Sequence, residues 1–301
     1  MVSLGSLLSR VSTNTKWRCI NGIAVGLLLS LGLIGCSSVK LGYNHAPALL
    51  QFQMDRYLDL NDAQEAMLSK ELEAFQAWHR QTALPEYART LRLWAQKLNQ
   101  PHTFTVQELL GKQTVFEDAL LVVAERSAYR LAPLVMTLTP KQQTRLQERF
   151  KKSNEEYAEE NLADSRGAEK ERLERYTDRF EEWLGPLTKG QEAILSAWLT
   201  SQPSRAQLWG QERMARQQAL LNLISDARDT PSAEQAAISL HDYFQSLSRY
   251  RIPALQSQRE TRLRDLAQLT ADMLNSMTTR QRQHLKETLL EYASDFESLS
   301  Q

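Results

Sequence analysis

The sequence predicts an all-α fold, and three observations point to it. Glycine is scarce after residue 36, β-branched residues do not alternate with polar ones, and the chain is rich in Ala, Leu, Gln, Glu and Arg, which favour helices. Prolines occur where helices would start or kink, at Pro85, Pro101, Pro140, Pro186, Pro203, Pro231 and Pro253. We therefore expect a multi-helix bundle or elongated helical hairpins, which follow an N-terminal signal peptide.

The bulk composition fits a folded protein and argues against nucleic-acid binding. Of 301 residues, 42% are hydrophobic and 24% are charged, which are ordinary values for a globular domain. The first 35 residues hold three of the 36 basic residues and no acid, so the rest of the chain has 33 basic and 36 acidic residues. A nucleic-acid-binding protein needs a net basic face to displace counterions from phosphates. We therefore expect no nucleic-acid partner.

The N-terminal segment has the three parts of a bacterial lipoprotein signal peptide. A basic region at residues 10–18 is followed by an uncharged and largely apolar stretch at residues 19–39. Within this stretch, Leu33-Ile34-Gly35-Cys36 resembles the lipobox. The small Gly35 fits the narrow site of the signal peptidase, and the thiol of Cys36 is the group that a diacylglycerol alkylates before cleavage. The sequence thus predicts cleavage between these two residues and a lipid on Cys36.

This interpretation sets the expected boundaries and location. Residues 1–35 would be the signal peptide, residues 36–46 a lipidated N-terminus and a tether reaching roughly 30 Å at most, and residues 47–301 the helical domain. Ser37, rather than Asp, after the cysteine favours the outer membrane of the cell envelope, facing the periplasm, by the rule of enteric-type bacteria. The alternative is an uncleaved membrane-spanning helix, for which the glycines of this segment are unfavourable.

A nine-residue pattern occurs four times along the chain. It consists of an apolar residue, Asn or Thr, two further residues, Gln, three further residues and an apolar residue. This is the pattern of a capping box, in which the Asn or Thr is the N-cap and the Gln at N3 reaches back to the N-cap amide. The pairs are Asn61 and Gln64, Thr139 and Gln142, Thr188 and Gln191, and Thr278 and Gln281. The pattern predicts a helix start at each.

The spacing of the four copies suggests two similar halves. The first two copies lie 78 residues apart and the last two lie 90 residues apart. We expect halves over residues 47–165 and 168–301, which could descend from a tandem duplication; the alternative is four independent capping boxes. The charged segment Lys141–Leu184 between the halves could be one long helix or two helices that meet near Gly167.

Further stretches carry resemblances to known families. The lipobox, Ser37–Asn44, Met54–Leu60, Trp78–Arg80 and Leu84–Pro85 are similar to an uncharacterised family of proteobacterial lipoproteins, which brings no known activity. The Leu-Thr-x-x-Gln copies resemble those of the Spy and CpxP periplasmic stress proteins. Those proteins are helical cradles for unfolded or misfolded clients, so the second resemblance implies a chaperone-like role.

The sequence contains no recognisable catalytic motif. We find no nucleophile elbow, no phosphate loop, no dinucleotide fingerprint and no His-Glu-x-x-His motif in the sequence. No histidine follows a Glu at the i,i+3 spacing of di-iron sites. His284 and Glu287 could share a metal, but two ligands do not make a site. His79 would need an orienting carboxylate to shuttle protons, so we expect it to be a packed or surface residue. We expect no catalytic residue, no metal and no cofactor.

Several other residues are candidates for a site. Asp55, Arg56 and Asp59 precede the first capping box, where a structural role suffices. We expect most tryptophans after residue 36 to lie in the core, and an exposed subset to mark a partner groove or a membrane contact. These tryptophans are Trp78, Trp94, Trp183, Trp198 and Trp209.

Together these features favour a non-catalytic protein that is tethered to a membrane through Cys36 and binds another protein or an envelope component. One alternative is a Spy-like periplasmic chaperone or envelope-stress sensor. The other is an envelope hydrolase with an unfamiliar site, which would need a polar cluster in a concave pocket.

Overall fold

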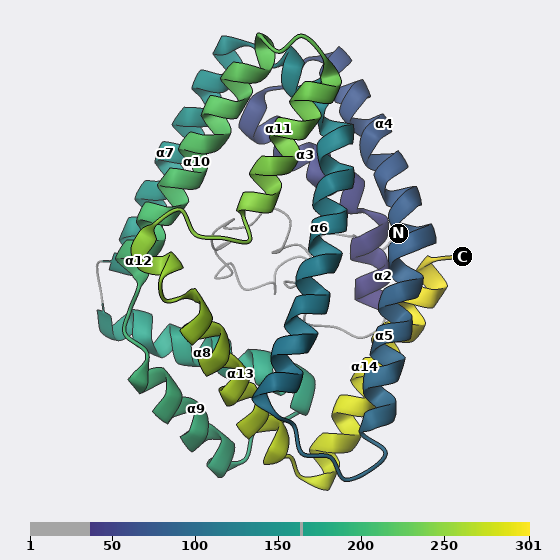
Figure 1. Cartoon of the computed structure of the whole chain (residues 1–301), viewed down its shortest axis with the longest axis vertical. Coiled ribbons are helices and arrows are strands. Elements are labelled where there is room, and N and C mark those ends of the chain that lie inside the picture. Colours follow the sequence, from purple (N-terminus) through teal and green to yellow (C-terminus); the bar gives the residue numbers. More distant parts are fainter. Residues whose placement is uncertain (1–36, 163–164) are drawn as a thin grey trace, which may run out of the picture. The chain divides into compact units, whose positions relative to one another are not determined.

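The computed structural model describes residues 37–162 and 165–301, and every regular element in these ranges is helical, which confirms the all-α prediction. The predicted signal peptide, with Gly35 and Cys36, lies outside the described residues. The elements are α2 (Ser37–Asn44), α3 (Ala46–Leu58), α4 (Asp62–Trp78), the π-helix η1 (His79–Ala83), α5 (Leu84–Lys97), α6 (Val106–Thr137), α7 (Pro140–Leu162), α8 (Ser165–Leu184), α9 (Lys189–Ser201), α10 (Ala206–Arg228), α11 (Ala233–Ser246), α12 (Pro253–Gln256), α13 (Arg259–Asn275) and α14 (Thr279–Leu299) (Figure 1).

The four repeated motifs start helices α4, α7, α9 and α14. At each start the N-cap side chain accepts a hydrogen bond from the N3 amide, and the Gln Oε1 accepts one from the N-cap amide. These eight bonds measure 2.9–3.3 Å. They satisfy amides that a helix start leaves without an intrahelical partner, so each motif is a complete capping box.

The glutamines of the capping boxes also pair with one another across the fold. Gln64 and Gln142 exchange two hydrogen bonds between their side-chain amides, of 3.3 and 2.6 Å. Gln191 and Gln281 do the same at 3.2 and 2.8 Å. All four side chains are buried. The first motif is thus joined to the second and the third to the fourth, which matches the grouping that the sequence spacing suggests.

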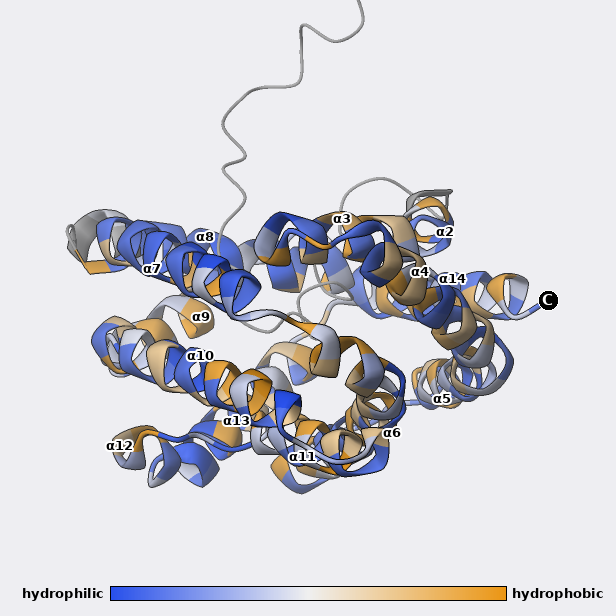
Figure 2. Ribbon diagram, turned by 90° about the horizontal axis from the view of Figure 1, so that it is seen from above, coloured by the Kyte–Doolittle hydropathy of each residue, from blue (hydrophilic) through white to orange (hydrophobic). Residues whose placement is uncertain are grey.

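Two hydrophobic cores surround these two joints. The first core consists of Leu58, Leu60, Leu68, Leu72, Leu134, Leu138, Leu146, Leu221 and Ile224. The second core consists of Ala95, Leu98, Phe104, Leu184, Leu195, Leu269, Met273, Leu285 and Leu289. Hydrophilic and hydrophobic residues are interleaved along the helices that supply them, as expected for helices with one buried face (Figure 2).

The two predicted halves are not separate domains, because each core recruits a helix from the other half. Helix α10 supplies Leu221 and Ile224 to the first core, and α5 supplies Ala95 to the second. Accordingly, α10 packs on α7 and α5 packs on α14 (Figure 1). All described residues belong to one compact unit.

The segment Ser37–His45, which we expected to be a tether, is helical over Ser37–Asn44 and is therefore much shorter than its maximum reach. Helix α2 occupies Ser37–Asn44, and backbone hydrogen bonds from His45 to Leu41 and from Leu49 to His45 carry the helical pattern on into α3. Eight helical residues span only about 12 Å. The segment contacts α3 and α14, and this packing stabilises a helix that would be too short to persist alone.

Two helices occupy the segment Lys141–Leu184, one of the two possibilities that the sequence leaves open. Helix α7 ends at Leu162 and α8 begins at Ser165, just before Gly167. Helix α7 packs on α3 and α10, whereas α8 packs on α9 and α14. Within the described part of the chain, no helix combines the length and the apolar character needed to cross a bilayer.

Candidate functional site

The most specific polar cluster holds helix α2 against the rest of the described chain. It joins three places in the sequence: the helix that follows residue 36, the junction of α4 with η1, and the last helix. We call it the α2-docking site, and its residues are Lys40, Tyr43, Asn44, Gln76, His79, Arg80, Asp295 and Leu299.

The site is built around the π-helix η1, which interrupts one long helical run from α4 to α5. The amide of Leu84 donates to the carbonyl of His79, five residues back, and this bond closes the wider turn. Pro85 follows directly and has no amide hydrogen, so the ordinary ladder cannot continue there. A π-turn inserts one residue into the helical repeat, and such turns are frequent at functional sites. Here η1 supplies both His79 and Arg80.

His79 and Tyr43 form the buried centre of the site. The Tyr43 hydroxyl lies 2.8 Å from Nδ1 of His79, and the His79 side chain is buried. Ring centroids of Tyr43, Phe75, Trp78 and Tyr87 lie 5.6–6.1 Å from that of His79. Burial lowers the pKa of His79 to about 4, and burial raises the pKa of Tyr43 to about 12 despite the nearby Arg80 guanidinium. Both groups are therefore neutral at pH 7, and the hydroxyl and Nδ1 share a hydrogen bond between uncharged partners.

Arg80 connects α2 to the C-terminal end of α14. Its guanidinium donates to the carbonyl of Leu299 at 2.8 Å and to Oδ1 of Asn44 at 2.5 Å. The same group lies 5.1 Å from the centroid of the Tyr43 ring, which gives a cation–π contact. One side chain thus ties together segments that lie more than two hundred residues apart in the sequence.

A second connection between α2 and α14 is ionic. Nζ of Lys40 lies 3.1 Å from Oδ1 of Asp295, whose side chain is 3% exposed. Gln76 adds a hydrogen bond from its Nε2 to the carbonyl of Tyr43. A carboxylate this deeply buried is stable only with a partner, so Asp295 favours the docked position of Lys40.

The chemistry of the site favours docking over proton transfer. An acid or base that works near neutral pH needs a pKa close to neutrality, and the pKa values of His79 and Tyr43 lie well below and well above it. The hydrogen bonds instead run between helices α2, η1 and α14. The site therefore fixes α2 in place.

Burial of neutral His79 makes stability depend on pH. Its pKa is about 4 in the folded chain and about 6.5 in the unfolded chain, so between these values the unfolded state binds more protons. The stability that neutral His79 contributes is complete above about pH 6.5 and is lost on acidification towards pH 4. The total loss approaches about 3 kcal/mol. We expect the variant H79Q to lose less free energy of unfolding than the wild type between pH 7 and pH 4.5, as measured by urea denaturation.

The matched control for this measurement is H241Q, at a half-exposed position on α11. It should keep the pH dependence that His79 causes in the wild type, because it leaves His79 in place. An equal loss of stability in H79Q and the wild type would contradict a neutral, buried His79.

The other residues singled out in the sequence take structural positions. Asp55 Oδ1 accepts the amide of Leu60, and Asp59, with φ of 58°, caps α3 in the left-handed region. Asp59 also lies 3.6 Å from Arg145. The side chain of Arg56 lies over the ring of Tyr57.

His284 and Glu287 do not converge on a common ligand position. The ring of His284 packs beside Gly185, and Glu287 accepts a hydrogen bond from Gln283 at 2.7 Å. Among residues 37–162 and 165–301, no group of three or more His, Cys, Asp or Glu side chains is placed to hold a metal.

The five tryptophans after residue 36 are all partly buried. Trp94, Trp183 and Trp198 pack against the second core. Trp209 packs edge-on against Tyr250 at 5.3 Å. The tryptophans therefore mark packing positions rather than an exposed groove.

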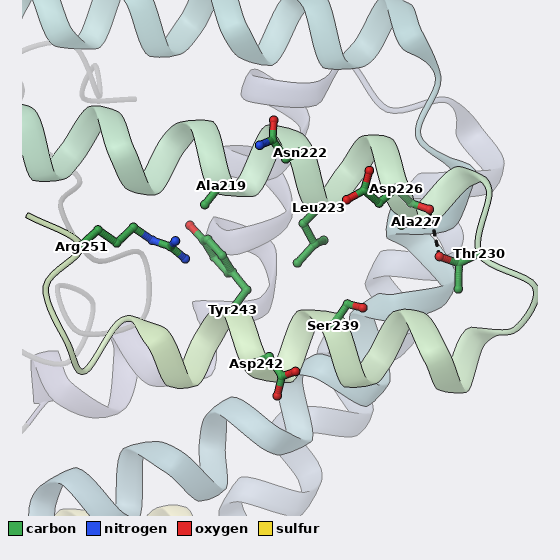
Figure 3. A pocket seen from close by; sticks show the side chains of 10 residues that line it. All are labelled: Ala219, Asn222, Leu223, Asp226, Ala227, Thr230, Ser239, Asp242, Tyr243 and Arg251. Carbon is green, nitrogen blue, oxygen red and sulfur yellow. Dashed lines mark hydrogen bonds between the residues drawn. The ribbon is translucent and has the colours of Figure 1, made fainter.

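A cavity of ≈ 430 Å³ lies between α10 and α11 (Figure 3). Leu223 and Tyr243 point into it from the two helices, and Arg251 reaches towards Tyr243. Its carboxylates do not converge, because Asp242 points away from α10 while Asp226 lies near Thr230. Both Asp side chains are exposed. The cavity thus lacks the convergent polar cluster that a hydrolase site needs.

The profile of a family of unknown function, DUF6279, matches residues 56–251. The chain belongs to this family. The prediction of an uncharacterised family is therefore confirmed, whereas the lipoprotein character stays a prediction. No curated protein and no solved structure matches the chain. The range matched by DUF6279 includes His79 and Arg80 but neither α2 nor α14.

Sequence reasoning had noted the stretches around Tyr43 and His79 without joining them. Nothing local indicates that residues 36 positions apart meet, because the π-turn that aims His79 has no sequence signature of its own. Asp295 was missed altogether. It lies in the last helix near apolar residues such as Tyr292 and Phe296. The sequence alone does not distinguish a buried acidic residue from an exposed one at such a position.

Proposed function

We propose that this member of DUF6279 is a lipid-anchored protein of the bacterial cell envelope with a binding role and no catalytic activity. The observation that carries the proposal is the position of α2. The described part of the chain starts with α2 at Ser37, directly after the predicted lipidated Cys36, and α2 is held by the α2-docking site. A lipid on Cys36 would therefore be attached to the body itself.

This arrangement gives the anchor a mechanical role. Several acyl chains on one residue bind a bilayer durably, whereas a single chain binds marginally. Because the contacts of Lys40, Tyr43 and Asn44 hold the first helix, the body cannot drift away on a long flexible linker. We propose that it lies against the membrane surface, on the outer membrane facing the periplasm.

The binding role rests on an exposed apolar row along α6. Val115, Val122 and Tyr129 are 54%, 51% and 54% exposed and recur every seven residues, so they share one face of the helix. Exposed apolar side chains that recur on one helix face can take part in binding a protein. A folded protein or envelope component is the partner that we propose. Unfolded clients are the alternative, and suppression of client aggregation by the wild type but not by V122E would favour that chaperone-like role.

Lipidation is tested by replacing the acceptor thiol. In the variant C36S we expect no incorporation of an alkyne-labelled fatty acid and accumulation of the unprocessed precursor, because the lipid must be added before cleavage. The measurement is in-gel detection of the fatty acid together with the mass of the mature N-terminus.

The control is C19S, which removes the other cysteine from within the predicted signal peptide. It should be lipidated and processed like the wild type. Normal processing of C36S, or a wild-type chain with its original N-terminus and no fatty acid, would overturn the proposal.

A further inference from the structure

The outward face of α2 and α3 carries a row of exposed apolar side chains. Leu41, Leu49 and Phe52 are 61%, 47% and 62% exposed. We infer that this row is the surface with which the body contacts the lipid bilayer. The inference rests on the proposed lipid anchor, and it goes further by stating which face of the folded chain lies on the membrane.

The row lies on one face because the helical pattern hardly breaks between the two helices. Hydrogen bonds of 3.1 and 3.0 Å join His45 to Leu41 and Leu49 to His45. Steps of three and four then place Leu41, His45, Leu49 and Phe52 on the same side. His45 and Ala48 on this side are exposed as well.

The opposite side of the same helices is fixed to the body. Leu50, Met54 and Tyr57 pack against the first core, and Tyr43 enters the α2-docking site. The helices therefore cannot rotate to bury Leu49 and Phe52. These side chains lose contact with water only when something outside the described chain covers them.

The charges around the row suit a bilayer whose headgroups are anionic. No acidic residue occurs between Ser37 and Met54, and the charged residue in this range is Lys40. The exposed Arg56 follows one turn after Phe52. Because Lys40 is already paired with Asp295, the exposed Arg56 is the cationic side chain that phosphate headgroups would meet along this edge.

The place of the row in the chain selects a bilayer over a protein partner. Cys36 directly precedes α2, and helical geometry puts Phe52 only about 22 Å from residue 37 along the helix. A lipid on Cys36 brings this stretch to the membrane without any further interaction. An amphipathic helix that lies flat buries its apolar side chains about 5–10 Å deep, at the boundary of headgroups and acyl chains.

The test places a fluorophore on the row in the mature, lipidated protein. With Cys36 modified and residues 1–35 removed, a cysteine introduced by L49C or F52C is the one reactive thiol of the chain. Each variant is labelled with an NBD fluorophore and reconstituted into phosphatidylethanolamine–phosphatidylglycerol vesicles. Doxyl-labelled lipids with the quencher near the headgroup then report contact with the bilayer. The matched controls are V122C on α6 and I238C on α11, which replace apolar residues that are 51% and 43% exposed.

We expect quenching at positions 49 and 52 to exceed that at positions 122 and 238 at least two-fold. Equal or weaker quenching at positions 49 and 52 would overturn the inference. A second copy of the chain could cover the row instead of the bilayer. The fluorophore at position 52 would then be shielded from water in lipid-free detergent, and this shielding would disappear on dilution; that result would also overturn the inference. Labelling of the wild-type chain by the NBD reagent would show that the Cys36 thiol is free. That result contradicts the proposed lipid anchor, and it is distinguished in this way from a failure of the membrane-contact inference.

Discussion

Replacing Glu212 with leucine is expected to lower the free energy of unfolding by about 3 to 5 kcal/mol, the largest effect of any single substitution proposed for this chain. Glu212 lies in α10 and is fully buried, with 0% of its surface exposed. Its carboxylate is shared between a neighbouring side chain and a loop that precedes α12. Leucine has a similar size, so the loss comes from hydrogen bonds rather than from volume.

Three donors depend on this carboxylate. Oε2 accepts the amides of Arg251 and Ile252 at 2.8 and 2.9 Å, and Oε1 accepts Nε of Arg216 at 2.6 Å. An amide that loses its partner costs about 1–3 kcal/mol where it is buried, and Arg216, whose side chain is 22% exposed, loses its counter-charge as well. The entry into α12 at Pro253 would also lose its fixed position.

Urea denaturation of the mature protein in detergent, followed by far-ultraviolet circular dichroism, measures the effect. The matched control is E156L, which makes the same change at an exposed position of α7 and should shift stability by less than about 0.5 kcal/mol. E212Q keeps an acceptor oxygen but adds donors, so its loss should fall between those of E156L and E212L. Equal midpoints for E212L and E156L would refute the role of Glu212.

Local motifs were readable from the sequence, whereas their partners were not. A capping box joins residues three apart, so the helix starts at Asn61, Thr139, Thr188 and Thr278 follow from spacing alone. The two glutamine pairs join residues 78 and 90 apart. The similar spacing of the copies grouped the motifs correctly but could not show that their side chains meet. Distant contacts need the packed fold.

Two local features depend on packing with distant segments. Ser37–Asn44 resembles a linker in the sequence because eight residues are too few for helix propensity to decide, and packing on α14 and α3 supplies the stability. Glu212 and Arg213 are both buried, although nothing in the sequence around them indicates it. Charged residues are almost never fully buried without partners, and the partners here come from distant segments.

The second large effect concerns the joint between the third and fourth capping boxes. We expect Q191A to lower the free energy of unfolding by about 3 kcal/mol, since the substitution removes the Gln half of a capping box and leaves buried amide groups unpaired. Gln191 Oε1 accepts the Thr188 amide at 2.9 Å and Nε2 of Gln281 at 2.8 Å. Thermal or urea unfolding of the mature protein provides the measurement.

Pairing predicts that the two glutamines act as a unit. Once Gln191 is gone, Gln281 has already lost both hydrogen bonds of the exchange, so the double variant Q191A/Q281A should lose about 1–2 kcal/mol less than the sum of the single losses. The control is Q283A on the same helix, an exposed glutamine whose loss should add to that of Q191A without coupling. The same double-mutant cycle at Gln64 and Gln142 should give a coupling free energy of similar size, because the two side chains exchange the same pair of hydrogen bonds there. Additive losses in both cycles would mean that the capping boxes act separately, and the two halves would then share a pattern without sharing a joint.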